Sequence, residues 1–206
     1  ANSPNGVVLD NVDIKGITIN DIGLNTGRQR SIGGAVGRSK SVDIRNCTVE
    51  DIDITSASGA VGGLAGNIDT GSISNVEMSD IKIVDNNTES PYIYSSVNKI
   101  YANVGGVLGC IGEIYDYDFS AKDITIDGLE ITTSFEMAGG IAGYVTPGTI
   151  FDKCTVKNAT VVCNLAKGTA ANTYKDGNNA GAIAGYMERN AKADLDLTGC
   201  VVENVT

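Results

Sequence analysis

Apolar residues recur along the chain with one spacing: an apolar residue is followed by others three, five, eight and ten positions later. This five-member template begins at residues 9, 44, 73, 121, 151 and 197, and its last copy lacks the fifth member. Members two apart have the period of a β-strand, and the step of three between the third and fourth members shifts the phase. Each template therefore predicts two short strands around a sharp bend.

Two positions of the template carry specific expectations. The residue before the fourth member is always Gly, Asp or Asn, which tolerate left-handed or turn dihedrals. This turn position holds Gly16, Asp51, Asp80, Gly128, Asn158 and Asn204. The second members should face inward as small hydrophobic core residues, cysteines included. They are Val12, Cys47, Val76, Ile124, Cys154 and Cys200.

A glycine motif lies between successive templates, at residues 33–37, 62–66, 105–109, 139–143 and 181–185. Small residues around an apolar pair predict a third strand packed tightly on the opposite wall. A phosphate-binding loop is the other use of such glycines, but no Gly-Lys-Ser/Thr and no strand–helix context follows. The motif is therefore interpreted as structural.

The repeat length defines the expected fold. Cys47 and Val76, which are equivalent, lie 29 positions apart, enough for one coil of three strands, and such a coil buries its apolar face only by stacking. We expect an all-β chain, a right-handed parallel β-helix (β-solenoid) of about six coils, with residues 1–206 as a single domain open at one or both ends. Crossover chirality favours the right hand, and a left-handed solenoid stays open as an alternative.

Insertions lengthen alternate coils. Residues 84–104 and 162–180 precede two of the glycine motifs, and residues 110–120 and 186–196 follow the same two motifs. Insertions in solenoids project as loops, often on the binding face. We therefore expect function to reside near these four segments.

Composition and charge exclude several classes of protein. Apolar residues make up 42% of the chain, with 3 Phe and no Trp, so the core must be aliphatic. A net charge of −10 argues against nucleic-acid binding, and no apolar stretch approaches the length of a membrane span. A local cluster of basic residues, Arg28, Arg30, Arg38, Lys40 and Arg45, is interpreted as a solvated edge, with a patch for an acidic ligand as the alternative. Without a signal peptide or initiating Met, the chain is expected to be a processed or excised segment.

The five cysteines show no CxxC spacing, which indicates neither a zinc site nor a full disulfide framework. Cys154 and Cys200 should lie on adjacent coils. The sequence leaves open whether they form a disulfide or belong to a buried ladder of thiols.

Residues 61–84, beginning Val-Gly-Gly-Leu-Ala-Gly and continuing Gly-Ser-Ile-Ser-Asn-Val, resemble the GLUG repeat. Residues 139–161 are similar, and the resemblance extends from Ser31 to the C-terminus. GLUG repeats belong to large bacterial surface proteins, including adhesins and the non-catalytic regions of IgA-specific metallopeptidases. The resemblance implies an extracellular adhesive or spacer role. It does not imply peptidase activity, because the zinc motif of those enzymes needs two His and this chain has none.

An enzyme is the least favoured interpretation, and no catalytic residue is assigned. His, the commonest general base, is absent. Asp51 and Asp80 would stack, but they occupy the turn position. The cluster Asp116, Tyr117 and Asp118 defines no acid–base pair. A polysaccharide lyase or hydrolase on this fold remains the alternative.

Tyrosines concentrate near the insertions and are the predicted ligand- or partner-binding residues, because aromatic rings with a polar end suit glycans or proteins. The candidates are Tyr92, Tyr94, Tyr101, Tyr115, Tyr117 and Tyr174. No cofactor or metal is expected. The alternative is calcium, for which Asp85, Asn87, Asp176 and Asn178 are the candidate oxygen ligands.

These expectations combine into one functional prediction. We expect a secreted or cell-surface structural and adhesive module, or stalk, whose partner is a host or cell-surface glycan or protein. The first alternative is a subunit that associates end to end into an extracellular filament, because uncapped strand edges invite pairing. The second alternative is a carbohydrate-active enzyme. Nucleic-acid binding and membrane insertion are not expected.

Overall fold

The computed structural model describes residues 6–21, 30–57, 59–86, 103–112, 118–134, 137–164, 179–187 and 196–206. Within these ranges the chain forms seventeen β-strands and no helix. The strands are β1 (Val7–Asp10), β2 (Asp13–Asn20), β3 (Ser31–Gly33), β4 (Val36–Ser56), β5 (Ala60–Gly62), β6 (Ala65–Asp85), β7 (Asn103–Gly105), β8 (Leu108–Ile111), β9 (Phe119–Thr133), β10 (Met137–Gly139), β11 (Ala142–Val145), β12 (Thr149–Asp152), β13 (Thr155–Cys163), β14 (Asn179–Gly181), β15 (Ala184–Met187), β16 (Asp196–Thr198) and β17 (Val201–Val205). None of the described segments is a helix that could span a membrane.

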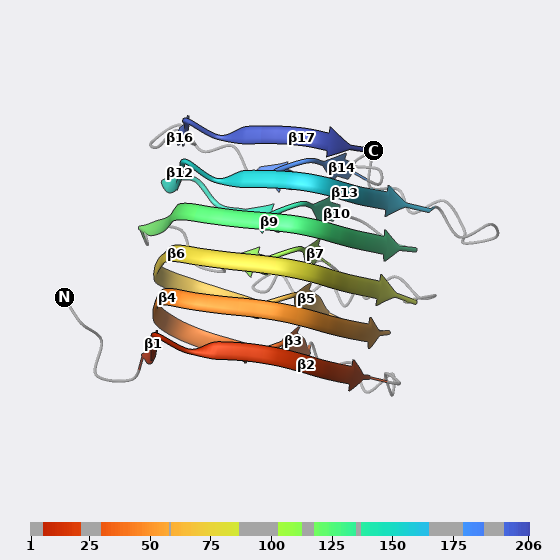
Figure 1. Ribbon diagram of the computed structural model, residues 1–206, viewed down its shortest axis with the longest axis horizontal. Helices are drawn as coiled ribbons and strands as arrows, with labels where there is room; N and C mark the ends of the chain where they lie inside the picture. The colour runs from red at the N-terminus through yellow and green to blue at the C-terminus, as the bar shows by residue number, and fades with distance from the viewer. Residues whose placement is uncertain are drawn as a thin grey trace, which may run out of the picture.

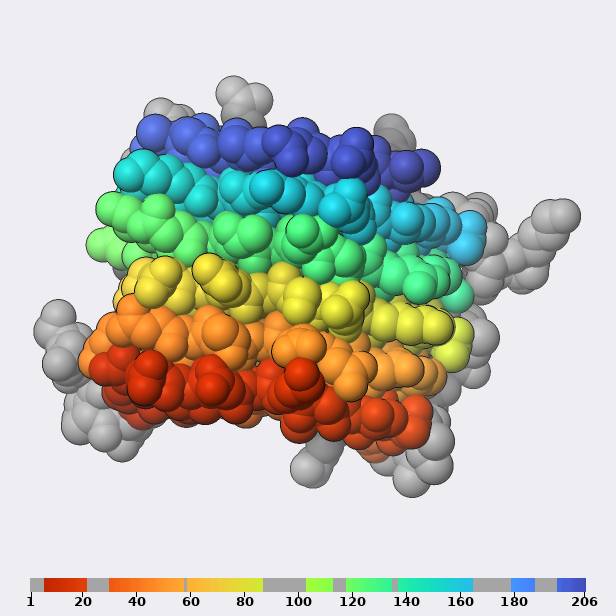
Figure 2. Space-filling model, in the orientation of Figure 1, coloured from red at the N-terminus to blue at the C-terminus, as the bar shows by residue number. Residues whose placement is uncertain are grey.

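The strands form two parallel sheets, one of twelve strands and one of five. The five-stranded sheet consists of the three-residue strands β3, β5, β7, β10 and β14. In Figure 1 the strands β2, β4, β6, β9, β13 and β17 lie one above another across the front, and the small sheet lies behind them. The space-filling view shows the same order as successive layers from the N-terminus to the C-terminus (Figure 2).

The predicted right-handed parallel β-helix of about six coils is wrong. The described strands form instead one open, curled parallel sheet, a half-barrel, with the small sheet beside it. Strands β4 and β6 each run for 21 residues, straight through the bend at which the sequence predicted two separate short strands. The predicted walls of a coil therefore merge into a single curved surface.

The template nevertheless determines which residues lie beside each other. Ile17 pairs with Ile52, Ile52 with Ile81, and Ile81 with Leu129. The row continues through Ala159 to Val205. Equivalent template members thus stack in register, because a shift by one residue would turn the apolar set outward.

Left-handed residues at two positions of each repeat explain why the long strands curve without breaking. The predicted turn position has positive φ in all six copies: Gly16, Asp51, Asp80, Gly128, Asn158 and Asn204. A second such row, which the sequence analysis missed, precedes the second template member: Asn11, Asn46, Asn75, Asp123, Lys153 and Gly199. Because every neighbour bends at the same place, pairing continues on both sides of each corner.

The glycine motif forms a fold-back bend that presses against the template wall. A Cβ at Gly63 would lie 2.3 Å from the carbonyl oxygen of Gly106 and 2.9 Å from Cγ2 of Ile81. The equivalent position at Gly106 is equally close to the carbonyl oxygen of Gly140, at 2.2 Å. The motif was predicted to be a third strand, but only its first glycine ends a strand of the small sheet. The next two residues make the bend.

One mainly aliphatic core, which also buries Phe119 and Phe151, fills the space between the two sheets. Template residues and the apolar pairs of the three central glycine bends belong to it; Ile54, Leu64, Ile83 and Val107 are fully buried. Template residues of the outermost rows, such as Val12 and Cys200, pack against this core but are only partly buried. The remaining second members, Cys47, Val76, Ile124 and Cys154, are at most 2% exposed.

Candidate functional site

A second, smaller cluster of buried residues lies apart from the main core. It contains Ala60, Cys110, Met137 and Tyr144, and Tyr186 packs against it. We call these five residues the second cluster. Its members come from both sides of the glycine bends: Ala60 and Met137 from the small sheet, the other three from the large sheet. Because successive strand residues point to opposite faces, Val61 enters the main core while Ala60 enters this cluster.

The second cluster lies along two columns of stacked side chains, which also contain residues outside it. The column on the small sheet is Ser31, Ala60, Asn103, Met137 and Asn179. The column on the large sheet is Arg38, Asn67, Cys110, Tyr144 and Tyr186. Glycines let the two columns approach, since a Cβ at Gly143 would lie 2.8 Å from the carbonyl carbon of Asn103. Unlike the apolar template rows, both columns mix polar and apolar residue types.

Two tyrosines form the aromatic part of the second cluster. The rings of Tyr144 and Tyr186 stack with centroids 5.7 Å apart and planes 17° apart. Tyr144 is buried, and Tyr186 lies half-buried on the next strand. An aromatic pair of this geometry contributes about 0.5–1.5 kcal/mol beyond the area it buries.

Asn103 is the polar anomaly of the region. Its side chain is 1% exposed, and neither its amide nitrogen nor its amide oxygen has a hydrogen-bond partner. Leaving a buried polar group without a partner costs about 1–3 kcal/mol. An amide can donate and accept at once, so this side chain could recognise a polar ligand such as a hydroxyl or a peptide group.

The ends of all four predicted insertions converge on this region. Asn103 and Cys110 lie at the inner ends of segments 84–104 and 110–120, and Asn179 and Tyr186 at those of segments 162–180 and 186–196. Met137 pairs with both Asn103 and Asn179. Tyr144 pairs with both Cys110 and Tyr186. The repeat that carries Met137 and Tyr144 has no insertion and lies between the two repeats that do. In each sheet, the insertion ends on its two sides are therefore two strand spacings apart, about 10 Å.

The six predicted binding tyrosines, Tyr92, Tyr94, Tyr101, Tyr115, Tyr117 and Tyr174, lie outside the described residues, as do the calcium candidates Asn87, Asp176 and Asn178. The fourth candidate, Asp85, is described and is 1% exposed. Its carboxylate accepts a hydrogen bond of 3.1 Å from the Thr133 hydroxyl. The structure brings Asp85 together with a hydroxyl, and among the described residues it belongs to no cluster of metal-ligating side chains.

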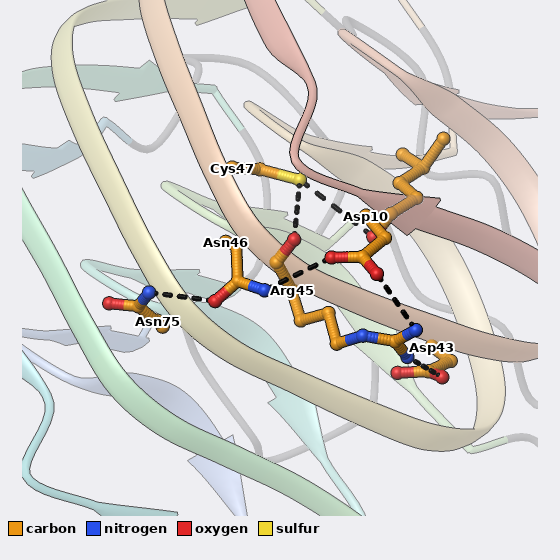
Figure 3. A network of polar contacts seen from close by, with 7 residues as sticks. Asp10, Asp43, Arg45, Asn46, Cys47 and Asn75 are labelled. Carbon is orange, nitrogen blue, oxygen red and sulfur yellow. Dashed lines mark hydrogen bonds and ion pairs between the residues drawn. The ribbon is translucent and has the colours of Figure 1, made fainter.

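A polar network follows the outer side of the left-handed corners (Figure 3). The Asn75 amide donates to Asn46 at 2.9 Å, and the Asn46 amide donates to Asp10 at 3.0 Å. Arg45 pairs with both Asp10 and Asp43. The Asn46 hydrogen bond, followed by Arg45, lowers the pKa of the Asp10 carboxyl below its ordinary 3.8. These side chains stabilise neighbouring repeats against each other.

The same network bears on the basic cluster. Arg45 is occupied by two carboxylates, and Arg30 pairs with Asp21 at 2.7 Å. Arg38 and Lys40 are exposed, and Arg28 lies outside the described residues. Arg30 and Arg45 are therefore neutralised within the fold, which favours a solvated edge over a patch for an acidic ligand.

The carboxylates considered for catalysis have structural positions. Asp51 and Asp80 sit at left-handed corners with φ of 58° and 53°. The backbone carbonyl of Asp118 accepts a hydrogen bond of 2.8 Å from the Thr70 hydroxyl. Asp116 and Tyr117 lie outside the described residues. The described part of this group is thus engaged in turns and backbone contacts.

Comparisons with family models, curated proteins and solved structures find no match to this chain.

Sequence reasoning missed the residues of the second cluster and Asn103. A signal was present in the columns that flank the glycine motifs, two positions before the first glycine and one position after the last. Those columns change from Ser and Arg to Asn, Met, Cys and Tyr along the chain, whereas the template positions hold only apolar residues and Cys. Alignment of the motifs would have singled out Asn103, Tyr144 and Tyr186.

Proposed function

We propose that this protein is a non-catalytic binding module that holds four insertions side by side and presents them to a partner outside the cell. The partner class we propose is a cell-surface glycan or protein, and the proposed location is secreted or cell-surface. The observation that carries the proposal is the convergence of the insertion ends on Met137 and Tyr144.

The scaffold suits this role because neighbouring repeats are held together by long stretches of parallel strand pairing. Parallel pairing between β4 and β6 extends over 17 residue pairs, from Val36 and Ala65 to Ser56 and Asp85. Binding residues held by ordered elements lose less conformational freedom on binding.

The chemistry of the region supports a glycan or a protein over a charged ligand. Tyrosine rings stack on sugar faces and make protein contacts, and the second cluster itself contains a tyrosine pair. The net charge of −10 disfavours polyanions. The resemblance of residues 61–84 to the GLUG repeat supports the same extracellular role.

The decisive experiment replaces tyrosines of one insertion. The double variant Tyr92→Ala/Tyr94→Ala is compared with the wild type on a glycan array and on immobilised cell-surface protein. We expect at least tenfold weaker binding, about 1.4 kcal/mol, with an unchanged melting temperature. The control removes an ion pair on the template wall, Lys157→Ala/Glu203→Ala, and should bind normally. Retained affinity in the tyrosine variant would contradict the proposal.

A second candidate function, end-to-end self-association, is favoured by one observation. In the described residues, the outermost strands β16 and β17 expose Leu197, Val201 and Val202, each 42–45% accessible. A strand edge with exposed apolar residues is a template for pairing with another chain. Negative-stain electron microscopy across a concentration series tests it: ordered fibres support self-association, and discrete particles at every concentration exclude it.

A further inference from the structure

Two cysteines lie side by side on neighbouring strands. Asp152 pairs with Thr198, and Thr155 pairs with Val201. This register brackets Cys154 and Cys200 and places them directly opposite each other. The backbone amide of Val201 also donates to the carbonyl oxygen of Cys154 at 2.9 Å. Neighbouring strands lie about 4.8 Å apart, within the Cα separation of roughly 4.4–6.8 Å that disulfides adopt.

The two thiols point the same way. The Cys154 thiol donates to the carbonyl oxygen of Ala121 at 3.4 Å, and the Cys200 thiol makes the equivalent contact with Phe151 at 3.5 Å. Burial, and to a smaller extent the neighbouring Cys200, raise the pKa of the Cys154 thiol. Both are free thiols in the structure.

Cys47 offers an internal comparison. It occupies the same template position, is 2% exposed, and its thiol also reaches a carbonyl oxygen of the preceding repeat, that of Leu9. Its strand neighbour on one side is Val76, and Val12 occupies the equivalent position on the other side. Cys47 therefore shares the environment of Cys154 but has no thiol beside it.

We propose that Cys154 and Cys200 form a redox-responsive pair, which a small disulfide such as oxidised glutathione converts into a disulfide that staples β16–β17 to β12–β13. The Cys200 thiolate attacks the small disulfide and releases one glutathione thiolate, which leaves a mixed disulfide on Cys200. The Cys154 thiol then loses its proton, attacks the Cys200 sulfur and expels the second glutathione. Two protein thiols are oxidised, and one disulfide is reduced to two thiols.

The order of these steps follows from burial. Cys200 is half-buried, whereas Cys154 is fully buried. Burial raises the pKa of the Cys154 thiol to about 12, so this thiol is a poor nucleophile until the mixed disulfide is beside it. The more accessible Cys200 is the point of entry. The resulting bond joins residues 46 positions apart in the chain and restricts the unfolded state.

The test treats the folded protein with oxidised glutathione and measures its intact mass, its peptide map and its melting temperature. The wild type should lose the mass of two hydrogen atoms, yield one cross-linked peptide containing Cys154 and Cys200, and melt roughly 5 °C higher or more. Reduction with dithiothreitol should reverse all three changes.

Substitution by valine, which the same template position already holds at Val12 and Val76, keeps each variant foldable. Cys200→Val should take up no glutathione at this site, Cys154→Val should stop at the mixed disulfide on Cys200, and Cys47→Val should behave like the wild type. The proposal is overturned if the folded wild type keeps its mass, or if the cross-link joins other cysteines. It does not depend on the proposed binding function.

Discussion

The main core and the second cluster are both buried, yet they are built in opposite ways. Every repeat contributes the same kind of side chain to a row of the main core, as Ile17, Ile52 and Ile81 do. The columns along which the second cluster lies mix residue types, with Asn103 between Ala60 and Met137 in one of them. In a row of similar apolar side chains, each member packs on its neighbours and stabilises the fold. In the mixed columns, the choice of residue at each position is not explained by stability alone.

The two regions also differ in whether their buried polar groups have hydrogen-bond partners. The described core residues of the template rows carry apolar or thiol side chains, so they leave no hydrogen-bonding amide buried. Asn103 buries an amide with no partner at the place where the insertions meet. Strain of this kind concentrates at functional sites. The contrast therefore separates the part of the molecule that holds the fold from the part on which the proposed binding function rests.

The largest expected effect breaks the contact between the glycine bends and the main core. Gly63→Val places a side chain where a Cβ alone would meet the Gly106 carbonyl oxygen at 2.3 Å. We expect a loss of more than about 3 kcal/mol in the free energy of unfolding, or failure to fold. Urea denaturation measures it.

The matched control changes a glycine with open space around it. A Cβ at Gly16 would be no closer than 3.9 Å to its nearest neighbour, Asp51 Oδ2. Asn158 and Asn204 already occupy the same left-handed position. Gly16→Asn should therefore stay within about 0.5 kcal/mol of the wild type. Similar losses for both variants would contradict the close approach at the bend.

Truncation of a main-core row is expected to have the next largest effect. Ile81 is 1% exposed and stacks between Ile52 and Leu129. Ile81→Ala should cost about 2–5 kcal/mol and Ile81→Val about 0.5–1.5 kcal/mol, both by urea denaturation. Neither should change ligand affinity while the protein is folded. A selective loss of binding in Ile81→Val would mean that the two regions are not separate.

A substitution at Asn103 is expected to have the opposite effect on stability from the main-core substitutions. Asn103→Leu removes the unpartnered amide and should raise the free energy of unfolding by about 1–3 kcal/mol, while it weakens binding of a polar partner. Asn179→Leu, in the same column but less buried, should stay within about 0.5 kcal/mol of the wild type. A destabilised Asn103→Leu variant would show that the amide is satisfied in solution.

The smallest effect concerns the polar network at the outer corners. The pKa of Asp10 is lowered in the folded state, so its stabilisation is complete above the ordinary pKa of 3.8 and is lost as pH falls through the folded value. Asp10→Asn should melt slightly below the wild type at neutral pH, and the difference should vanish in acid. Melting curves across pH measure it. A difference that persists in strong acid would exclude ionisation of Asp10 as its cause.

The template shows how far the sequence could predict the fold. Its spacing predicted parallel strands, their register and the left-handed turn position, because inward and outward residues alternate with a fixed period. It also predicted breaks at the bends, and there it was wrong. Asp51 and Asp80 bend the chain without interrupting strands β4 and β6, since neighbouring repeats bend together and keep their hydrogen bonds.

The candidate site was less predictable than the fold. Segment lengths placed the insertions in alternate repeats, but Tyr144 and Met137 belong to the repeat without insertions. Their importance comes from strand neighbours that are between 34 and 42 positions away in the sequence, such as Cys110 and Tyr186. No local sequence pattern shows that the ends of the four insertions pair with Met137 and Tyr144.

The sequence by itself determined which residues are stacked and which face the core, because apolar spacing and residues tolerant of positive φ act locally. Only the tertiary structure decided that the walls join into one open, curled sheet, that the glycine bends press against the template wall, and that Asn103 is buried without a partner. Those outcomes depend on close approach between distant backbones, a property that no single repeat contains.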